Sequence, residues 1–321
     1  MKRFVVAGLI AITLGLLAYS LMEKKKTLVF VANSNGDFWK AAAAGIKSAQ
    51  EELPNYKLVF KFPSQPTAEA QIDLMNDLTA SGTAGIMVSV IDPKASSEAL
   101  NRISGKLALF TTNSDAPETG RIAYIGSANA DAGKQAGELV LKALPDGGKC
   151  MGFVGLPDAD NAKERIQGVK DAIAGSNVEL VDVRVDNIDH ALAKRNVEDT
   201  LATNPDINCM IGIVAYEAPI IYGVLTDSGK LGKIKIIGFD ANPVTLGGIQ
   251  EGAIVGSVVQ QPYQWAYYGM IDMAKYLDGD KSFIPENKLI IVPTLVVDQS
   301  NVGVFWENLK MEENLAKESG F

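Results

Sequence analysis

Two large aromatic side chains, Phe38 and Trp39, follow Asp37 in the segment NGDFW, where a helical pattern begins. An accessible aromatic ring can stack on the apolar face of a ligand, so this pair predicts a stacking surface. Asp37 suits the N-cap position, which would place both rings in the first turn of the helix. The pair could instead be a hydrophobic staple that packs the start of the helix. These residues alone leave both interpretations open.

Patterns for catalysis and metal binding are missing from the sequence. The lone histidine, His190, has no histidine or cysteine cluster beside it, so a surface or helix-cap position is expected. No GxGxxG or GxxxxGK[ST] motif occurs, and nucleotide binding is therefore not indicated. Asp115, Glu217 and Asp240 follow predicted strands, but glycoside hydrolysis needs two carboxylates at a defined separation. We expect no enzyme activity, no cofactor and no metal site.

Short β-branched runs alternate with helical patterns after residue 26, which is typical of βαβ units in a parallel sheet. The first series comprises TLVFVAN, YKLVFKF, AGIMVSV and LALFTTN, and the second comprises KCMGFVG, VELVDVRV, NCMIGIVA, IKIIGFD and AIVGSVV. We therefore predict an α/β fold with two Rossmann-like lobes, each a parallel sheet flanked by helices. The C-terminal part is expected to be shared between the lobes, with a helix near YQWAYYGMIDMAKYLDGD and a strand near KLIIVPTLVV.

The net charge of the chain and its first 26 residues indicate which partners and which cellular location to expect. The 38 acidic and 30 basic residues give a net charge of -8, so a nucleic-acid partner is not expected. Residues 1–26 combine Lys2 and Arg3 with a long uncharged apolar run, which predicts an export segment. The sequence Ala18-Tyr19-Ser20 fits a cleavage site, whereas the length of the run approaches that of a membrane span. A signal peptide and a membrane anchor both stay open.

The two cysteines, Cys150 and Cys209, each stand near the start of an apolar run. Buried free thiols are the simplest interpretation, because cysteine packs as a small hydrophobic residue. An exported protein also permits a disulfide between them. Two cysteines do not make a metal site.

The order and spacing of several motifs carry a family resemblance. These motifs are NGDFW, TTNSDAP, IGSANADAGKQAGE, NAKERIQGVKDAI, GFDANP and VVQQPYQWAYYG. Together they resemble the periplasmic sugar-binding proteins of ABC transporters, of the ribose-binding type, which share the type I periplasmic binding protein fold with the ligand domain of the lactose-repressor family. The resemblance implies three crossovers, near residues 128, 261 and 294. It divides the chain into an N-terminal lobe of residues 27–127 plus 262–293 and a C-terminal lobe of residues 129–260 plus 295–321.

The resemblance also implies which residues bind the ligand. They follow strands or open helices, at the edge where a ligand would lie between the lobes. The predicted ligand-binding residues are Phe38, Trp39, Asn113, Ser114, Asp115, Asn161, Arg165, Glu217, Asp240 and Gln260. Asn113 and Glu217 stand where relatives commonly carry Asp or Asn, so the identity of the sugar does not carry over. Tyr216 and Tyr263 could add contacts or simply pack.

The implied function is capture of a sugar or polyol by hinge closure and its delivery to an ABC transporter permease. A monomer in the periplasm or another extracytoplasmic location is expected, either free or anchored to the inner membrane. The alternative is a membrane-anchored sensing module that presents bound sugar to a receptor. A transcriptional regulator of the same fold would need a helix-turn-helix before the first lobe, where this chain carries its export segment.

Overall fold

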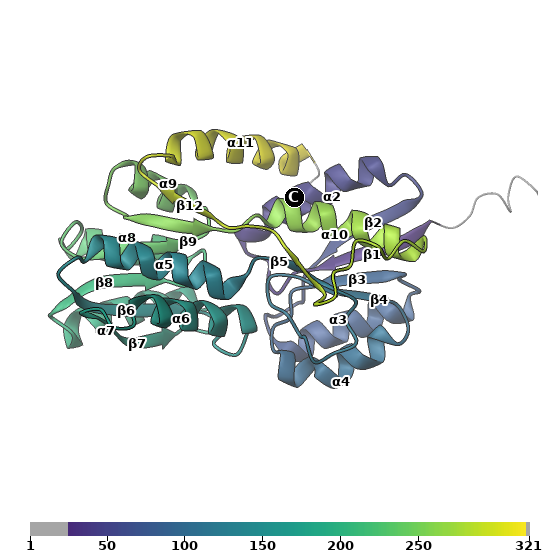
Figure 1. The fold of residues 1–321 in the computed structure, drawn as a ribbon, viewed down its shortest axis with the longest axis horizontal. Coiled ribbons are helices and arrows are strands. Elements are labelled where there is room, and N and C mark those ends of the chain that lie inside the picture. Colours follow the sequence, from purple (N-terminus) through teal and green to yellow (C-terminus); the bar gives the residue numbers. More distant parts are fainter. Residues whose placement is uncertain (1–24, 319–321) are drawn as a thin grey trace, which may run out of the picture.

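The computed structural model describes residues 25–318 of the chain. Two six-stranded sheets lie side by side along the long axis of the molecule, and helices flank each of them (Figure 1). This arrangement confirms the predicted α/β class with two lobes. The predicted export segment, residues 1–26, lies almost entirely outside the described residues. Between residues 25 and 318, no helix has the length and apolar character needed to cross a membrane.

We call the lobe that contains β1 the N-terminal lobe. Its strand order is β11-β5-β4-β3-β1-β2, with parallel pairing throughout. The strands are β1 (Lys26–Val31), β2 (Tyr56–Lys61), β3 (Gly85–Val88), β4 (Ala108–Thr111), β5 (Tyr124–Gly126) and β11 (Leu289–Ile291). The helices of this lobe are η1 (Asp37–Trp39), α2 (Lys40–Glu52), α3 (Ala68–Ala80), α4 (Pro93–Ser104) and α10 (Pro262–Leu277).

Successive residues of β1 point to opposite faces of the sheet, and each face has its own core. Leu28 and Phe30 pack in the cluster that contains residues of α2 and α10. Val29 and Val31 pack in the cluster that contains residues of α3 and α4. Gly45 lets α2 and α10 approach closely, because an added Cβ would lie 2.2 Å from a backbone oxygen of α10.

We call the other lobe the C-terminal lobe. Its strand order is β12-β10-β9-β8-β6-β7, and β12 pairs antiparallel with β10, so this sheet is not purely parallel as predicted. The strands are β6 (Gly148–Val154), β7 (Val178–Val185), β8 (Ile207–Gly212), β9 (Lys235–Phe239), β10 (Gly256–Val259) and β12 (Leu295–Asp298). The helices are α5 (Asn129–Ala143), α6 (Asp160–Ile173), α7 (His190–Thr203), α8 (Glu217–Asp227), α9 (Pro243–Gln250) and α11 (Val302–Glu318).

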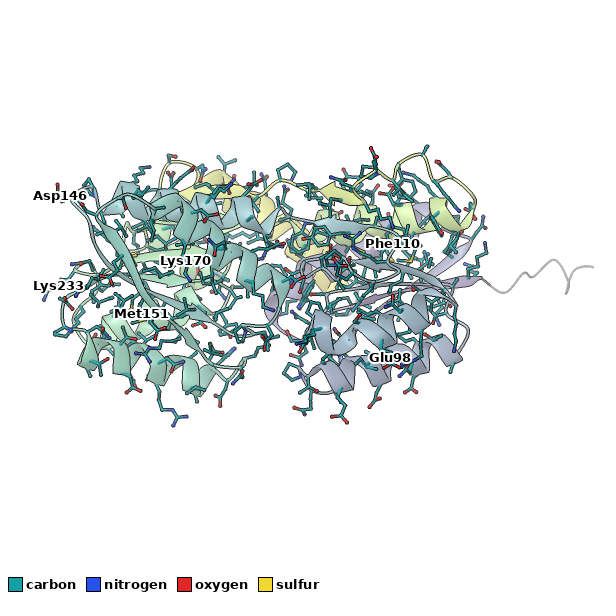
Figure 2. All side chains as sticks on the ribbon, turned by 60° about the horizontal axis from the view of Figure 1, so that its bottom comes forward. Glu98, Phe110, Asp146, Met151, Lys170 and Lys233 are labelled. Atoms are coloured by element: carbon teal, nitrogen blue, oxygen red, sulfur yellow. The ribbon has the colours of Figure 1, made fainter. Side chains whose placement is uncertain are left out.

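The central strands of both sheets are buried on both faces. Phe110 in one lobe and Met151 in the other are fully buried, and Figure 2 shows both within the layers of their lobes. Cys150 and Cys209 are Cα partners on the neighbouring strands β6 and β8, and both are buried free thiols. Burial and the neighbouring Cys150 raise the pKa of the Cys209 thiol.

The chain passes between the lobes at three places: between β5 and α5, between β10 and α10, and between β11 and β12. The C-terminal part is shared between the lobes, as expected, but the single strand predicted near KLIIVPTLVV is two strands, β11 in one lobe and β12 in the other. Pro293 lies between these strands, and proline cannot donate to a strand ladder. Gln261 Nε2 donates a hydrogen bond of 2.8 Å to the carbonyl of Pro293, which joins two of the connections directly.

The start of α2 differs from the prediction. The 3-10 turn η1 occupies Asp37–Trp39, and Trp39 holds the N-cap position of α2 without a side-chain cap. The prediction that Asp37 caps this helix is therefore wrong. The Trp39 N–H donates 3.0 Å to the Gly36 carbonyl, so the backbone makes a tighter turn before the helix begins.

Candidate ligand-binding cleft

A cleft of about 1330 Å³ lies between the two lobes. The carboxyl ends of parallel strands meet at one edge of each sheet, and loops that follow β1, β4, β8 and β9 line this cleft. Seven of the predicted ligand-binding residues line it, namely Phe38, Trp39, Asn113, Asn161, Arg165, Asp240 and Gln260. Ser114, Asp115 and Glu217 do not. The fold thus brings most of the predicted residues together across the gap between the lobes.

Phe38 and Trp39 differ in how far their rings are buried. Trp39 is 3% exposed, and its ring packs edge-on against Phe30 at 5.6 Å between centroids. Its Nε1 donates a 3.0 Å hydrogen bond to Asn33 Oδ1, which ties the first loop to the helix. Phe38 is only half-buried and lies 4.9 Å from the Trp39 ring, also edge-on. Trp39 therefore packs mainly in the core, and Phe38 has the more accessible ring at the cleft.

Asp240 and Gln260 form a polar pair on the C-terminal wall. Asp240 Oδ1 accepts hydrogen bonds from the Gln260 backbone N–H at 3.1 Å and from Gln260 Nε2 at 3.0 Å. Asp240 has a φ of 62°, and Ser257 Oγ fixes this left-handed backbone by donating to the Asp240 carbonyl at 2.8 Å. Gln260 Oε1 is buried and has no hydrogen-bond partner within residues 25–318. Burial raises the pKa of Asp240, and Arg165 opposes this shift.

Arg165 lies deepest among the cationic groups of the cleft, with 1% exposure. Its Nε donates to Asn129 Oδ1 at 3.2 Å, and its Nη1 donates to the Ile213 carbonyl at 3.1 Å. The guanidinium also lies over the Phe239 ring, 4.8 Å from the centroid. Nη2 is buried without a hydrogen-bond partner among the described residues. Burial lowers the pKa of Arg165, whereas Asp240 raises it. A buried donor of this kind is poised for an acceptor from a ligand.

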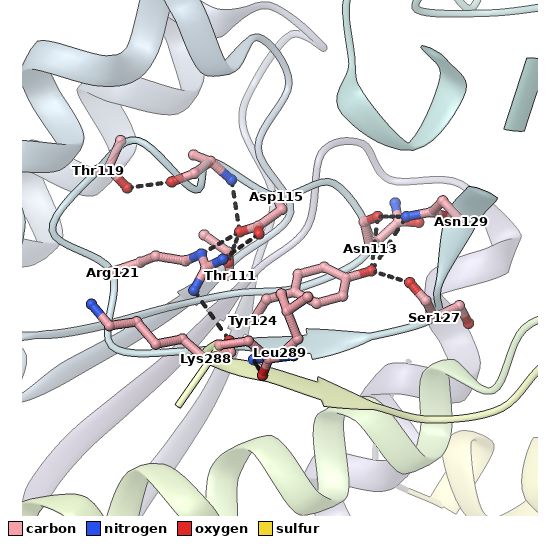
Figure 3. Close-up of polar contacts among 12 residues, drawn as sticks. Thr111, Asn113, Asp115, Thr119, Arg121, Tyr124, Ser127, Asn129, Lys288 and Leu289 are labelled. Carbon is pink, nitrogen blue, oxygen red and sulfur yellow. Dashed lines mark hydrogen bonds and ion pairs between the residues drawn. The ribbon is translucent and has the colours of Figure 1, made fainter. Parts of the chain in front are cut away.

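Asn113 links the two lobes at the cleft. Its Oδ1 accepts a 3.2 Å hydrogen bond from Asn161 Nδ2 of α6. Its carbonyl accepts a 3.1 Å bond from Asn129 Nδ2 of α5, as Figure 3 shows. Its own Nδ2 donates to Ser89 Oγ at 3.1 Å. Asn113 follows β4 of the N-terminal lobe, so the bonds from Asn161 and Asn129 join the lobes, whereas the bond to Ser89 stays within the N-terminal lobe.

Asp115 lies away from the cleft because Arg121 holds its carboxylate. Arg121 Nε lies 2.6 Å from Asp115 Oδ1, and Arg121 Nη2 lies 2.6 Å from Oδ2 (Figure 3). The Thr111 hydroxyl and the Ala116 N–H also donate to this carboxylate. Ser114 is fully buried beside it and does not line the cleft. The structure therefore gives Asp115 a fold-stabilising role.

Glu217 is the first residue of α8 and is fully buried behind the cleft wall. Neither of its carboxyl oxygens has a hydrogen-bond partner among the described residues, and the same holds for Asp186 Oδ2. Burial, followed by the nearby Asp186 carboxylate, raises the pKa of Glu217 to about 10. This shift favours the protonated form of the Glu217 carboxyl group. The structure therefore does not place Glu217 with the predicted ligand-binding residues that line the cleft.

Among the lining residues outside the predicted set, two aromatic rings lie on each other. His190 and Tyr216 stack with 4.6 Å between ring centroids, and both line the C-terminal wall. Tyr216 Oη donates 2.6 Å to Asp186 Oδ1, which fixes the ring. An added Cβ on Gly155 would lie 2.4 Å from Tyr216 Oη, so glycine is needed there. His190 is exposed at the start of α7, as expected. It lines the cleft because α7 begins shortly after the carboxyl end of β7.

Tyr263 also lines the cleft, and its hydroxyl donates to Ser48 Oγ at 2.9 Å, which fastens α10 to α2. Across residues 25–318, no group of three or more His, Cys, Asp or Glu side chains is placed to hold a metal ion. The cleft thus offers aromatic surface, amides, one guanidinium and one carboxylate. This set can bind hydroxyl groups through paired donors and acceptors.

Comparison with known proteins gives the family. Residues 27–281 match the periplasmic binding protein domain family. The ribose import binding protein RbsB of Salmonella typhimurium is 23% identical over 263 residues, which cover 81% of this chain and 87% of that protein. All of these matches are to binding proteins, in agreement with the expectation that the chain is not an enzyme.

Two solved structures have the same fold. An ABC transporter solute-binding protein from Burkholderia graminis C4D1M, in complex with D-arabinose, is 26% identical with a TM-score of 0.81 and covers 87% of this chain and 98% of its own. The glucose-galactose binding protein GanP from Geobacillus stearothermophilus is 25% identical with a TM-score of 0.81 and covers 87% and 99%. The resemblance inferred from the motifs is confirmed, and the chain belongs to the periplasmic binding protein domain family, with the type I fold.

Proposed function

We propose that this protein captures a sugar or polyol in the cleft between its lobes and delivers it to an ABC transporter permease. The ligand makes contact with both lobes only when they are closed, and binding therefore shifts the population toward the closed form. The permease recognises that form. The lobes divide at the crossovers near residues 128, 261 and 294, and the protein acts as a periplasmic monomer.

One observation carries the proposal. Two buried polar atoms in the cleft, Arg165 Nη2 and Gln260 Oε1, have no hydrogen-bond partner among the described residues. One is a charged donor and the other is an acceptor, and a hydroxyl group can serve both. Phe38 supplies a partly accessible ring from the opposite lobe for the C–H face of a sugar. Buried polar atoms without partners are costly, so a ligand that completes them gains affinity.

Phe38, Trp39, Asn113, Asn161, Arg165, Asp240 and Gln260 are the proposed binding residues, because each lines the cleft. Ser114, Asp115 and Glu217 are not proposed as contacts, since they lie outside its lining. The relatives are named for ribose import and for binding glucose and galactose, and one structure holds D-arabinose. These names support a monosaccharide. The thermal-shift screen described next distinguishes pentose, hexose and polyol.

A thermal-shift screen tests the proposal. The panel contains D-ribose, D-arabinose, D-allose, D-xylose, D-glucose, D-galactose and the corresponding polyols. A ligand at 100 times its dissociation constant stabilises the folded state by about 2.7 kcal/mol, which is readily detected. We expect at least one member to raise the melting temperature of the wild type and to raise that of Arg165→Ala much less. Arg102→Ala is the control, because Arg102 is an exposed arginine on α4 that pairs with Glu98 on the same helix. An unshifted melting temperature across the whole panel would reject sugar capture.

Location and partner need separate experiments. N-terminal sequencing of the exported protein distinguishes a cleaved leader, with a mature start near residue 21, from a retained anchor. Stimulation of a reconstituted permease by the sugar-loaded protein tests delivery. The sensing alternative is not proposed, because the relatives reported above include proteins named for ribose import and for an ABC transporter.

A further inference from the structure

Asn129 is a buried residue of the motif IGSANADAGKQAGE that the predicted ligand-binding set did not include. It is the first residue of α5, where the chain has just crossed from β5 of the N-terminal lobe into the C-terminal lobe. Asn129 is 4% exposed and does not line the cleft. Its amide nevertheless makes hydrogen bonds on both sides of the crossover.

The oxygen and the nitrogen of the Asn129 amide bind different lobes. Oδ1 accepts a 3.2 Å hydrogen bond from Arg165 Nε of the C-terminal lobe. Nδ2 donates to the Asn113 carbonyl of the N-terminal lobe at 3.1 Å and lies 3.4 Å from Tyr124 Oη (Figure 3). An arginine N–H can only donate and a carbonyl can only accept, so these partners allow one orientation of the amide. Asn129 thus connects Arg165 to the other lobe through a single side chain.

Tyr124 fixes the N-terminal side of this connection. Its hydroxyl donates to the Ser127 carbonyl at 2.8 Å and lies 3.3 Å from the Asn113 carbonyl (Figure 3). An added Cβ on Gly126 would lie 2.4 Å from Tyr124 Oη, so glycine leaves room for the hydroxyl. The contacts of Asn129 therefore lie at the first crossover, where rotation of the lobes displaces atoms least, because points near a hinge axis move through the shortest arcs.

The rest of Arg165 is held by helix packing and by a backbone group. An added Cβ on Gly133 of α5 would lie 2.2 Å from the Arg165 carbonyl oxygen, so glycine allows α5 and α6 to pack closely there. Arg165 Nη1 donates to the Ile213 carbonyl. Within the described part of the chain, Asn129 is the one side chain that hydrogen-bonds to the guanidinium. Without this acceptor, a single hydrogen bond would fix the direction in which Nη2 points.

We propose that Asn129 is a positioning residue for ligand binding, which orients the Arg165 guanidinium from the first crossover and does not touch the sugar. This role rests on the proposed function, because it concerns how Arg165 meets the sugar. Oδ1 holds Nε in place, and this leaves the unpartnered Nη2 available to a hydroxyl group in the cleft. Asn129 raises affinity through Arg165 alone, so removal of Arg165 removes the effect of Asn129.

Calorimetric titration with the sugar found by the thermal-shift screen tests this dependence in a double-mutant cycle. In the wild type, Asn129→Ala should weaken binding about fivefold, the typical effect of one lost hydrogen bond. In the Arg165→Ala background, the same substitution should change affinity by less than about twofold. An equal loss in both backgrounds, or no loss in the wild type, would overturn the positioning role.

Asn196→Ala is the matched control for a general loss of stability. Asn196 is a half-buried residue of α7 in the C-terminal lobe, it does not line the cleft, and its Nδ2 donates to the Val185 carbonyl at 3.0 Å. Urea unfolding measures the stability of both variants, and Asn196→Ala should bind the sugar as the wild type does. A similar loss of affinity in Asn196→Ala would show that destabilisation alone weakens binding, and it would overturn the role.

Exchange of the Arg165 Nε proton with water is a second measurement, made by NMR on protein with isotope-labelled arginine and without sugar. The spectrum of Arg165→Ala identifies the signal. The proton should exchange slowly in the wild type and in Asn196→Ala, and at least about tenfold faster in Asn129→Ala. Equal exchange in all three proteins, or exchange in the wild type at the rate of free arginine, would overturn the positioning role.

The two measurements separate this role from the proposed function. Proton exchange decides whether Asn129 holds Arg165 even if no sugar binds to the wild type, which would reject sugar capture. Conversely, unchanged affinity in Asn129→Ala would overturn the positioning role and leave sugar capture by the wild type untouched.

Discussion

Replacing Glu217 by glutamine should change how the stability of the protein depends on pH. Glu217 is fully buried, both of its carboxyl oxygens lack a partner among the described residues, and its pKa is raised from 4.5 to about 10. Asp186 Oδ1 accepts from Tyr216 Oη at 2.6 Å and from the Ile188 N–H at 2.8 Å. We expect Glu217 to keep its proton in the folded chain at neutral pH.

The sign of the effect follows from the raised pKa. The unfolded chain releases this proton near pH 4.5, whereas the folded chain keeps it up to about pH 10. The stability that Glu217 contributes is therefore fully present below pH 4.5 and is lost as the pH rises toward 10. One retained proton changes the free energy of unfolding by about 1.4 kcal/mol per pH unit, which gives a loss of at most about 4 kcal/mol between pH 5 and pH 8.

Glu217→Gln cannot ionise. Guanidinium unfolding followed by circular dichroism at pH 5, 6, 7 and 8 measures the difference in stability between variant and wild type. From pH 5 to pH 8, we expect the free energy of unfolding of the variant to rise by about 2–4 kcal/mol relative to that of the wild type. Glu98→Gln, at an exposed surface pair with Arg102, should track the wild type within about 0.5 kcal/mol. A constant difference between Glu217→Gln and wild type at all four pH values would refute the retained proton.

Three further predictions concern packing and binding. Trp39→Ala should lower the free energy of unfolding by about 3–5 kcal/mol in chemical denaturation, because the ring is 3% exposed in the core; a loss below 1 kcal/mol would show that the ring is not packed there. Arg165→Ala should weaken sugar binding in calorimetry by roughly 1–3 kcal/mol, and wild-type affinity would remove Arg165 from the site. Asp115→Asn should lower the free energy of unfolding by about 3 kcal/mol, because it weakens the pair with Arg121, and should leave sugar affinity unchanged. A loss of sugar affinity of comparable size would show that Asp115 contributes to binding.

The fold could be predicted from local patterns, because βαβ alternation dictates parallel strands and helices on both faces. The C-terminal part is shared between the lobes as expected, although the run KLIIVPTLVV forms two strands and not the one predicted. The antiparallel direction of β12 was not predicted, because it depends on where the chain returns after the last crossover. The contact between α11 and α2 was also not predicted, because it depends on tertiary packing.

The candidate site could be predicted to the level of strand ends, but not to the direction of each side chain. Asn113 and Asp115 follow the same strand, yet one lines the cleft and the other turns back to Arg121. Glu217 follows β8 but is fully buried and does not line the cleft, whereas the preceding Tyr216 does. A loop turns within two or three residues, and only the packed backbone decides which side chain faces the ligand.

Calorimetric titration of one variant from each lobe tests most directly whether both lobes hold the ligand. Phe38 lines the cleft from the N-terminal lobe and Asp240 from the C-terminal lobe. The titrations use the sugar that gives the largest thermal shift. We expect Phe38→Ala and Asp240→Asn each to weaken binding at least tenfold, or about 1.4 kcal/mol. The control Glu98→Gln, on the outer surface, should bind as the wild type does. Wild-type affinity in either cleft variant would contradict capture between the lobes.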